Sequence, residues 1–258
     1  MDLEMAGKVV LITGGSDGLG LALARRLVQE DAAVAICGRD DARLTAARQG
    51  LEALGADVLA LTADVERAED VARFVSGAVT RWSRIDGVVH NAGRSAAGPL
   101  EANDDAAWEG DLQLKVMGAV RLVRTALPYL RESHGAALFT LAMAAKAPGA
   151  ASAPSSVSRA AGMALMKSLS KELGPEGIRV NAILIGLVES GQWVRGAAAA
   201  GMELPAFYER MAANAGIPLG RVGRGEEFAD LASYLLSARA SYVTGAAINL
   251  DGGLSPVV

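Results

Sequence analysis

The sequence is poor in the residue types that bind metals or form disulfides. One cysteine, Cys37, and two histidines, His90 and His134, occur in 258 residues. A single cysteine excludes an internal disulfide, and its position within an apolar run is typical of core packing. Neither histidine has a cysteine or histidine partner at ligand spacing, so we expect no metal site.

Long apolar runs and a strong charge of either sign are also missing. No stretch reaches the roughly 18 uninterrupted apolar residues that a membrane span requires. The first residues, Met1-Asp-Leu-Glu, are acidic and lack the basic and apolar segments of a secretory signal. The net charge is −4 and is scattered along the chain, so we expect neither nucleic acid nor a membrane as partner. These absences favour a cytoplasmic protein.

What the sequence does contain is a regular alternation of short apolar runs with longer amphipathic ones. This pattern is typical of βαβ units and a parallel sheet. We expect strands at Val9–Thr13, Ala33–Cys37, Asp57–Leu61, Ile85–His90, Ala136–Ala142, Arg179–Leu184 and Ala247–Leu250. We expect helices near 19–30, 40–53, 67–82, 104–131, 155–173 and 225–237. The predicted fold is α/β, a Rossmann-type doubly wound sheet of seven mainly parallel strands with helices on both faces, forming one domain over 1–258.

The segment 190–218 differs from the rest of the chain. It is long, partly helical, and contains Trp193, Phe207 and Tyr208 among alanines. It follows the sixth expected strand, where ligand crevices open in such sheets, so we interpret it as a substrate lid. A helix pair that covers the sheet edge or contacts another subunit is the alternative.

The first expected strand runs into a glycine-rich turn. Lys8-Val-Val-Leu-Ile-Thr13 is followed by Gly14-Gly-Ser-Asp-Gly18-Leu-Gly20, which opens a helix. This arrangement directs free backbone N–H groups and the positive end of the helix dipole at a pyrophosphate. A Gly-x3-Gly-x-Gly pattern alone is a weak signal, but here it has the expected strand and helix around it.

Further motifs occur in order along the chain. They are Asp64-Val65, Asn91-Ala92-Gly93, Pro218-Leu-Gly-Arg221, Tyr242-Val-Thr-Gly245 and Asp251-Gly-Gly253. Together with the glycine-rich turn they resemble the short-chain dehydrogenase/reductase superfamily, in the compact form close to bacterial 3-oxoacyl reductases. The resemblance covers essentially the whole chain.

The resemblance implies a nicotinamide dinucleotide site. Glycines 14, 18 and 20 would let the backbone approach the pyrophosphate, and Asp64 with Val65 would meet the adenine. Ile185-Gly186 stands where the family usually has Pro-Gly, and Ser190 matches a threonine that touches the nicotinamide amide. The full expected set is Gly14, Ser16, Asp17, Gly18, Leu19, Gly20, Arg39, Asp64, Val65, Asn91, Ala92, Gly93, Arg159, Gly186, Val188 and Ser190.

The end of the second expected strand indicates the type of nicotinamide cofactor. A carboxylate there binds a free ribose 2′-hydroxyl, whereas a guanidinium binds a 2′-phosphate. The chain has Arg39 at this point and no carboxylate until Asp40. We therefore expect NADP(H) rather than NAD(H).

The positions of the family's catalytic residues are all changed. The resemblance places the carbonyl-polarising serine at Ala142, the proton-donating tyrosine at Ser155, the lysine at Arg159 and the relay asparagine at Lys115. Alanine offers no hydroxyl, serine is a far weaker acid than a phenol, and arginine stays protonated. Ser155, Arg159 and Lys115 are therefore the candidate catalytic residues, with Thr140, Ser156 and Tyr208 as other possible donors.

Three functions fit these observations. The first is an atypical NADP(H)-dependent oxidoreductase for an apolar carbonyl or enoyl substrate; alkene reduction suits it better because water can supply the proton. The second is a catalytically inactive nucleotide-binding pseudoenzyme. The third is a non-redox lyase or dehydratase on the same scaffold. The resemblance also implies a homodimer or homotetramer.

Overall fold

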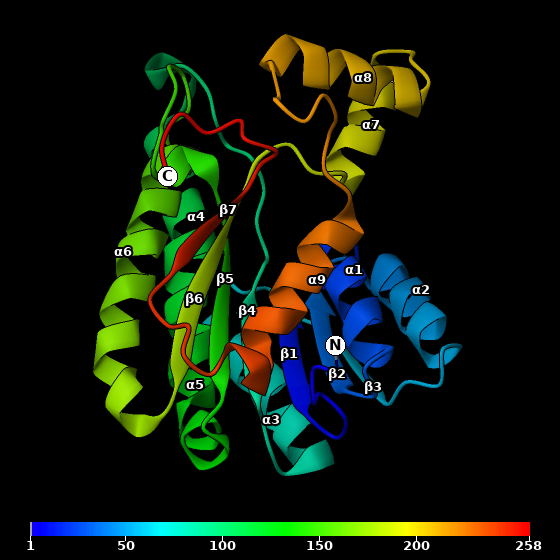
Figure 1. The fold of residues 1–258 in the computed structure, drawn as a ribbon, viewed down its shortest axis with the longest axis vertical. Helices are drawn as coiled ribbons and strands as arrows, with labels where there is room; N and C mark the ends of the chain where they lie inside the picture. Colours follow the sequence, from blue (N-terminus) through cyan, green and yellow to red (C-terminus); the bar gives the residue numbers. More distant parts are fainter. Residues whose placement is uncertain (1) are drawn as a thin grey trace.

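The computed structural model describes residues 2–258 and contains one seven-stranded sheet (Figure 1). All neighbouring strands are parallel, in the order β3-β2-β1-β4-β5-β6-β7. The strands are β1 (Val9–Thr13), β2 (Ala33–Gly38), β3 (Val58–Thr62), β4 (Gly87–His90), β5 (Ala136–Ala142), β6 (Arg179–Ile185) and β7 (Ala247–Leu250).

The central strands are buried along their whole length because both faces of the sheet are covered. Val9–Thr13 is buried at every position, and so is Gly87–His90. These strands lack the alternation of apolar and polar residues that is typical of a strand with one face exposed to solvent. The strand order reverses between β1 and β4, which places a topological switch point, where ligands bind in such sheets, beside the glycine-rich turn.

Helices pack on both faces of the sheet (Figure 1). One face is covered by α1, α2 and α9, which contribute Leu23, Leu44 and Phe228 to one apolar cluster. The other face is covered by α3, α5 and α6, with Phe74 and Met166 among the buried residues. The α-helices are α1 (Gly18–Val28), α2 (Asp41–Glu52), α3 (Ala68–Trp82), α4 (Asp105–Leu112), α5 (Gly118–Ser133), α6 (Ser155–Leu173), α7 (Gly191–Ala199), α8 (Leu204–Ala215) and α9 (Gly225–Leu236).

The predicted α/β fold with seven strands is confirmed. Three strands and the helix over 155–173 have the expected bounds, and other ends differ by about one or two residues, as helix and strand ends commonly do. Short 3-10 turns occur at Leu100–Ala102, Met143–Ala145, Gly174–Glu176 and Ala238–Ala240.

The helix expected near 104–131 is present, but it contains a π-helical turn that the sequence did not predict. A π-helical segment, η2 (Gln113–Met117), separates α4 from α5. A π segment inserts one extra residue into the turn, a feature that apolar periodicity does not reveal. In this protein the segment carries Lys115, whose side chain is buried.

The segment 190–218 forms α7 and α8, which lie beyond the carboxyl ends of the strands (Figure 1). The first residue of α7, Gly191, lies against Asp17 at the start of α1, so the pair is anchored beside the switch point. Among residues 2–258, no helix combines the length and apolar character needed to cross a membrane.

Candidate functional site

The glycine-rich turn is fastened to the end of β4. The side-chain amide of Asn91 donates to the carbonyl oxygens of Thr13 and Gly14, each at 3.1 Å. Gly14 has φ of +66°, and a Cβ there would lie 2.9 Å from the Cα of Ala92. The turn therefore needs glycine for both its conformation and its close approach to the neighbouring loop.

Gly20 has a different role from the one expected. It does not line the cavity described below, and a Cβ on it would lie 2.3 Å from the carbonyl oxygen of Gly14. The residue faces the preceding turn because it lies on the packed side of α1. Gly20 lets the helix approach the turn, whereas Gly14 and Gly18 line the cavity itself.

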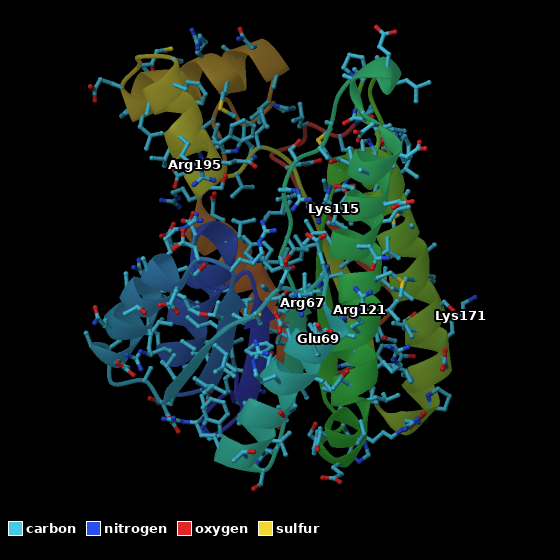
Figure 2. All side chains as sticks on the ribbon, turned by 180° about the vertical axis from the view of Figure 1, so that it is seen from behind. Arg67, Glu69, Lys115, Arg121, Lys171 and Arg195 are labelled. Atoms are coloured by element: carbon cyan, nitrogen blue, oxygen red, sulfur yellow. The ribbon has the colours of Figure 1, made fainter. Side chains whose placement is uncertain are left out.

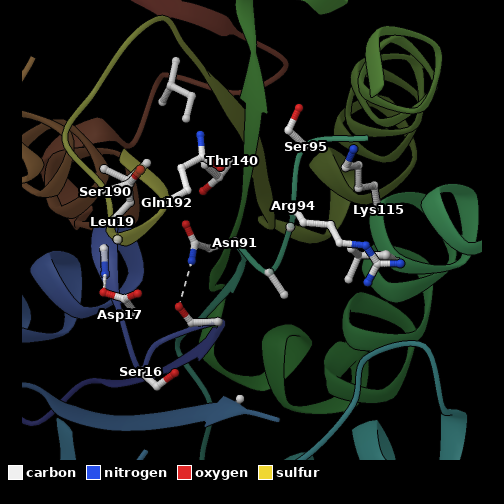
Figure 3. A pocket seen from close by; sticks show the side chains of 18 of the residues that line it. Ser16, Asp17, Leu19, Asn91, Arg94, Ser95, Lys115, Thr140, Ser190 and Gln192 are labelled. Atoms are coloured by element: carbon white, nitrogen blue, oxygen red, sulfur yellow. Dashed lines mark hydrogen bonds between the residues drawn. The ribbon is translucent and has the colours of Figure 1, made fainter. Parts of the chain in front are cut away.

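A large cavity opens at the carboxyl ends of the strands, and we call it the main cavity. Its volume is about 760 Å³, within the usual range for a cofactor site. Figure 3 shows Asp17 and Ser190 on one side and Lys115 on the other, with Asn91 and Thr140 between them. It is lined by all the expected cofactor residues except Gly20: Gly14, Ser16, Asp17, Gly18, Leu19, Arg39, Asp64, Val65, Asn91, Ala92, Gly93, Arg159, Gly186, Val188 and Ser190.

Several basic side chains line the main cavity, as a ligand with phosphates would require. Arg39 lies at the end of β2, is 58% exposed, and has Asp64 at 3.9 Å and Glu66 at 3.8 Å. Arg94 and Arg195 line the same cavity and were not identified from the sequence. Figure 2 shows Arg195 on α7, on the opposite side of the cavity from Lys115.

Lys115 is one of the most buried side chains of the protein. Its ammonium is 1% exposed and lies 2.5 Å from Oδ1 of Asp111, which is equally buried. The other oxygen of Asp111 accepts a hydrogen bond from the hydroxyl of Ser158 at 2.5 Å. Burial, followed by repulsion from Arg159, lowers the pKa of Lys115 to about 8, although Asp111 opposes this shift.

Ser155 is the hydrogen-bond partner of Lys115 in the main cavity. The Nζ of Lys115 donates to Oγ of Ser155 at 2.8 Å, and the backbone N–H of Ala96 donates to the same oxygen at 2.8 Å. In both hydrogen bonds Oγ of Ser155 is the acceptor. The hydroxyl hydrogen of Ser155 is not donated to any group among residues 2–258. This hydrogen is therefore available to a ligand in the cavity.

Arg159 lies one turn after Ser155 on α6 and supplies a buried positive charge. Its guanidinium donates to the backbone carbonyl of Thr140 at the end of β5. Burial lowers its pKa to about 10, with Asp111 opposing the shift, so the group stays charged at neutral pH. A Cβ on Gly93 would lie 2.9 Å from its Nη2, which shows how closely the guanidinium approaches this backbone.

The remaining candidate positions differ in what they offer. Ala142 lines the main cavity with a methyl group and no hydroxyl. Oγ1 of Thr140 and Oγ of Ser190 are buried without a hydrogen-bond partner in the described part of the chain, and both residues line the cavity. Tyr208 does not line it, nor does any other tyrosine of residues 2–258, so the structure shows no phenol there.

Two further contacts of this site were missed by the sequence reasoning. Asp111 precedes Lys115 by four residues, a spacing that brings side chains together on a helix and could have indicated the ion pair. The N–H of Ala96 belongs to a loop whose position depends on the tertiary fold. No local sequence signal marks such a donor.

The match to a family model covers residues 14–255, and that family is described as enoyl-(acyl carrier protein) reductase. The L-fucose dehydrogenase of Bos taurus is 32% identical over 256 residues, covering 98% of this chain and 91% of the relative. An NADPH-bound short-chain oxidoreductase of Pseudomonas aeruginosa with an atypical catalytic center superposes with a TM-score of 0.92, at 37% identity over 97% of this chain and 98% of that one.

The L-sorbose reductase of Gluconobacter frateurii, solved with NADPH and L-sorbose, gives a TM-score of 0.94 at 31% identity, with both chains covered completely. Sequence and fold thus agree along the whole chain with proteins that catalyse oxidation and reduction. The chain belongs to the short-chain dehydrogenase/reductase superfamily of oxidoreductases.

Proposed function

We propose that this protein is an NADP(H)-dependent oxidoreductase that reduces an apolar carbonyl or enoyl compound, with Lys115 and Ser155 as its proton source. Support for the cofactor comes from the glycine-rich turn, the basic lining of the main cavity and Arg39 at the end of β2. Three similar proteins of known structure were solved with NADPH.

The residues of the main cavity fit a nicotinamide dinucleotide. Gly14 and Gly18 would hold the pyrophosphate, Arg39 the 2′-phosphate, and Asp64 with Val65 the adenine. The unpartnered hydroxyl of Ser190 would meet the nicotinamide amide. When bound, the cofactor supplies the hydride.

The observation that carries the proposal is the 2.8 Å hydrogen bond from Lys115 to Ser155 inside this cavity. Ser155 would donate its free hydroxyl hydrogen to the substrate, and the Lys115 ammonium would replace that proton across the existing hydrogen bond. A lysine whose pKa is about 8 is a much better acid at neutral pH than a serine hydroxyl. Arg159 stays charged and would hold ribose hydroxyls or stabilise developing negative charge.

The missing hydroxyl at Ala142 favours alkene reduction over ketone reduction. A ketone accumulates negative charge on its oxygen in the transition state, and donors to that oxygen are commonly worth a factor of about 100 or more. At the position of Ala142 the cavity offers only a methyl group, so this donor is missing. The reduction of a conjugated alkene depends less on a donor to the substrate oxygen, because water can deliver the proton after hydride addition.

The segment 190–218 would act as the substrate lid. Trp193, Gln192 and Arg195 of α7 line the main cavity, while α8 packs behind α7 through Phe207 and Gly196. An indole at the cavity wall suits an apolar substrate, and α7 lies over the carboxyl ends of the strands.

The experiment measures NADPH binding and the loss of its absorbance with a panel of ketones and enoyl thioesters. We expect turnover of at least one enoyl compound. With a ketone substrate, Ser155→Ala should lower kcat by about 100-fold and leave the Kd for NADPH unchanged. Ser152→Ala is the matched control, because Ser152 precedes α6 and does not line the cavity. Tight binding without turnover would instead support a pseudoenzyme, and substrate loss without change in NADPH a lyase.

A further inference from the structure

We propose that Ser155 and Lys115 also form a nucleophile–base pair that accepts an acyl group from an activated ester or thioester and passes it to water. This activity uses the same two side chains as the proposed reductase but needs no nicotinamide. Acyl transfer can therefore be measured without NADPH, so its presence or absence is independent of whether the protein acts as a reductase.

The geometry around Ser155 is that of an activated serine. Its Oγ receives hydrogen bonds from Nζ of Lys115 and from the N–H of Ala96, both at 2.8 Å. Ser155 is also the first residue of α6, a 19-residue helix, and so lies at the positive end of its dipole. Each of these features stabilises negative charge on Oγ, as a nucleophilic serine requires.

Lys115 has the surroundings of a base. The charged groups that face it are Asp111 on its own helical run, Arg159 on α6 and Arg94 on the loop after β4. Burial and the two arginines favour the neutral amine, and Asp111 favours the ammonium, leaving a pKa of about 8. About a tenth of the lysine is then neutral at neutral pH. Serine–lysine pairs of this kind act in known hydrolases.

The reaction balances without an oxidant or reductant. Neutral Lys115 takes the hydroxyl proton of Ser155 as Oγ attacks the acyl carbon. The bond from the acyl carbon to the leaving sulfur or oxygen breaks, and the leaving group takes that proton from Lys115. Water then attacks the acyl-serine with Lys115 again as base, releasing the carboxylic acid and restoring Ser155. Arg159 lines the same cavity and supplies a fixed positive charge for the oxyanion.

An acyl donor can reach this pair because both side chains line the main cavity. Ala142 lines the same cavity with a methyl group, which leaves no hydroxyl there. Among residues 2–258, Lys115 is the lysine that lines this cavity.

The experiment uses the full chain without nucleotide and p-nitrophenyl acetate as the acyl donor. We expect a burst of about one nitrophenol per chain, and an acetyl group on the peptide that contains Ser155, found by mass spectrometry. Ser155→Ala should abolish the burst. Lys115→Arg keeps the ion pair with Asp111 but removes the base, so the acylation rate should fall by about 100-fold or more.

The matched controls are Ser152→Ala, in the loop before α6, and Lys171→Arg, on the exposed surface of α6 (Figure 2). Both should acylate at the wild-type rate. The proposal is overturned if no acyl-serine forms, if the acetyl group is on a different residue, or if Lys115→Arg acylates as fast as the wild type. Circular dichroism of each variant shows whether a lost burst reflects a lost fold, and Lys115→Arg remains decisive if Ser155→Ala does not fold.

Discussion

Replacing Lys115 with methionine should destabilise the protein strongly, because the residue neutralises a buried carboxylate. Lys115 and Asp111 are each about 1% exposed, and without the ammonium the carboxylate keeps only the hydroxyl of Ser158. Breaking a buried ion pair by removing one partner costs about 3–5 kcal/mol. For a chain of this length, each kcal/mol lowers Tm by about 2–4 °C, so we expect a fall of about 6–20 °C.

The measurement is the free energy of unfolding in urea together with Tm by calorimetry. Lys115→Arg should lose much less stability, because it retains the positive charge beside Asp111. The double variant Lys115→Met with Asp111→Asn should recover most of the loss, since the neutral amide no longer needs a counter-charge. A loss below about 1 kcal/mol for Lys115→Met, or no recovery in the double variant, would refute this account of the pair.

Three other substitutions test the cofactor site and the reaction. Arg39→Ala should raise the Kd for NADPH by roughly 10-fold and leave that for NADH nearly unchanged, measured by fluorescence titration, because the exposed guanidinium would bind the 2′-phosphate that NADH lacks. Gly20→Ala should cost about 1–3 kcal/mol of stability and weaken NADPH binding, because its Cβ would overlap the carbonyl of Gly14; an unchanged Tm would contradict this. Ala142→Ser should raise kcat for a ketone by roughly 10-fold and change alkene reduction little, which steady-state rates on paired substrates would show.

Much of the fold was predictable because local pattern and tertiary burial agree. The run Val9–Thr13 is apolar at nearly every position and becomes a strand buried on both faces. The helix over 155–173 was predicted with its final bounds. The π turn at Gln113–Met117 was not predictable in this way, since apolar periodicity does not reveal one extra residue in a helical turn.

The sequence allowed the residues of the site to be predicted, but not the contacts between their side chains. Family spacing indicated Lys115, Ser155 and Arg159, and all three line one cavity. The spacing did not reveal that Lys115 would be buried against Asp111 or hydrogen-bonded to Ser155, because these contacts join separate parts of the chain. The depressed pKa of Lys115 follows from those contacts and so needed the structure.

The dependence of kcat on pH tests the Lys115–Ser155 proton source most directly, measured as NADPH oxidation with a saturating ketone substrate. In reduction the ammonium of Lys115 is the active form, so kcat should be highest below its pKa and fall as the pH rises through about 8. Acyl transfer to Ser155 needs the neutral amine and should show the opposite trend. In Lys115→Arg the fall in kcat should disappear, because arginine stays charged throughout this range. A wild-type kcat that is independent of pH around 8, or an unchanged fall in Lys115→Arg, would contradict the assignment.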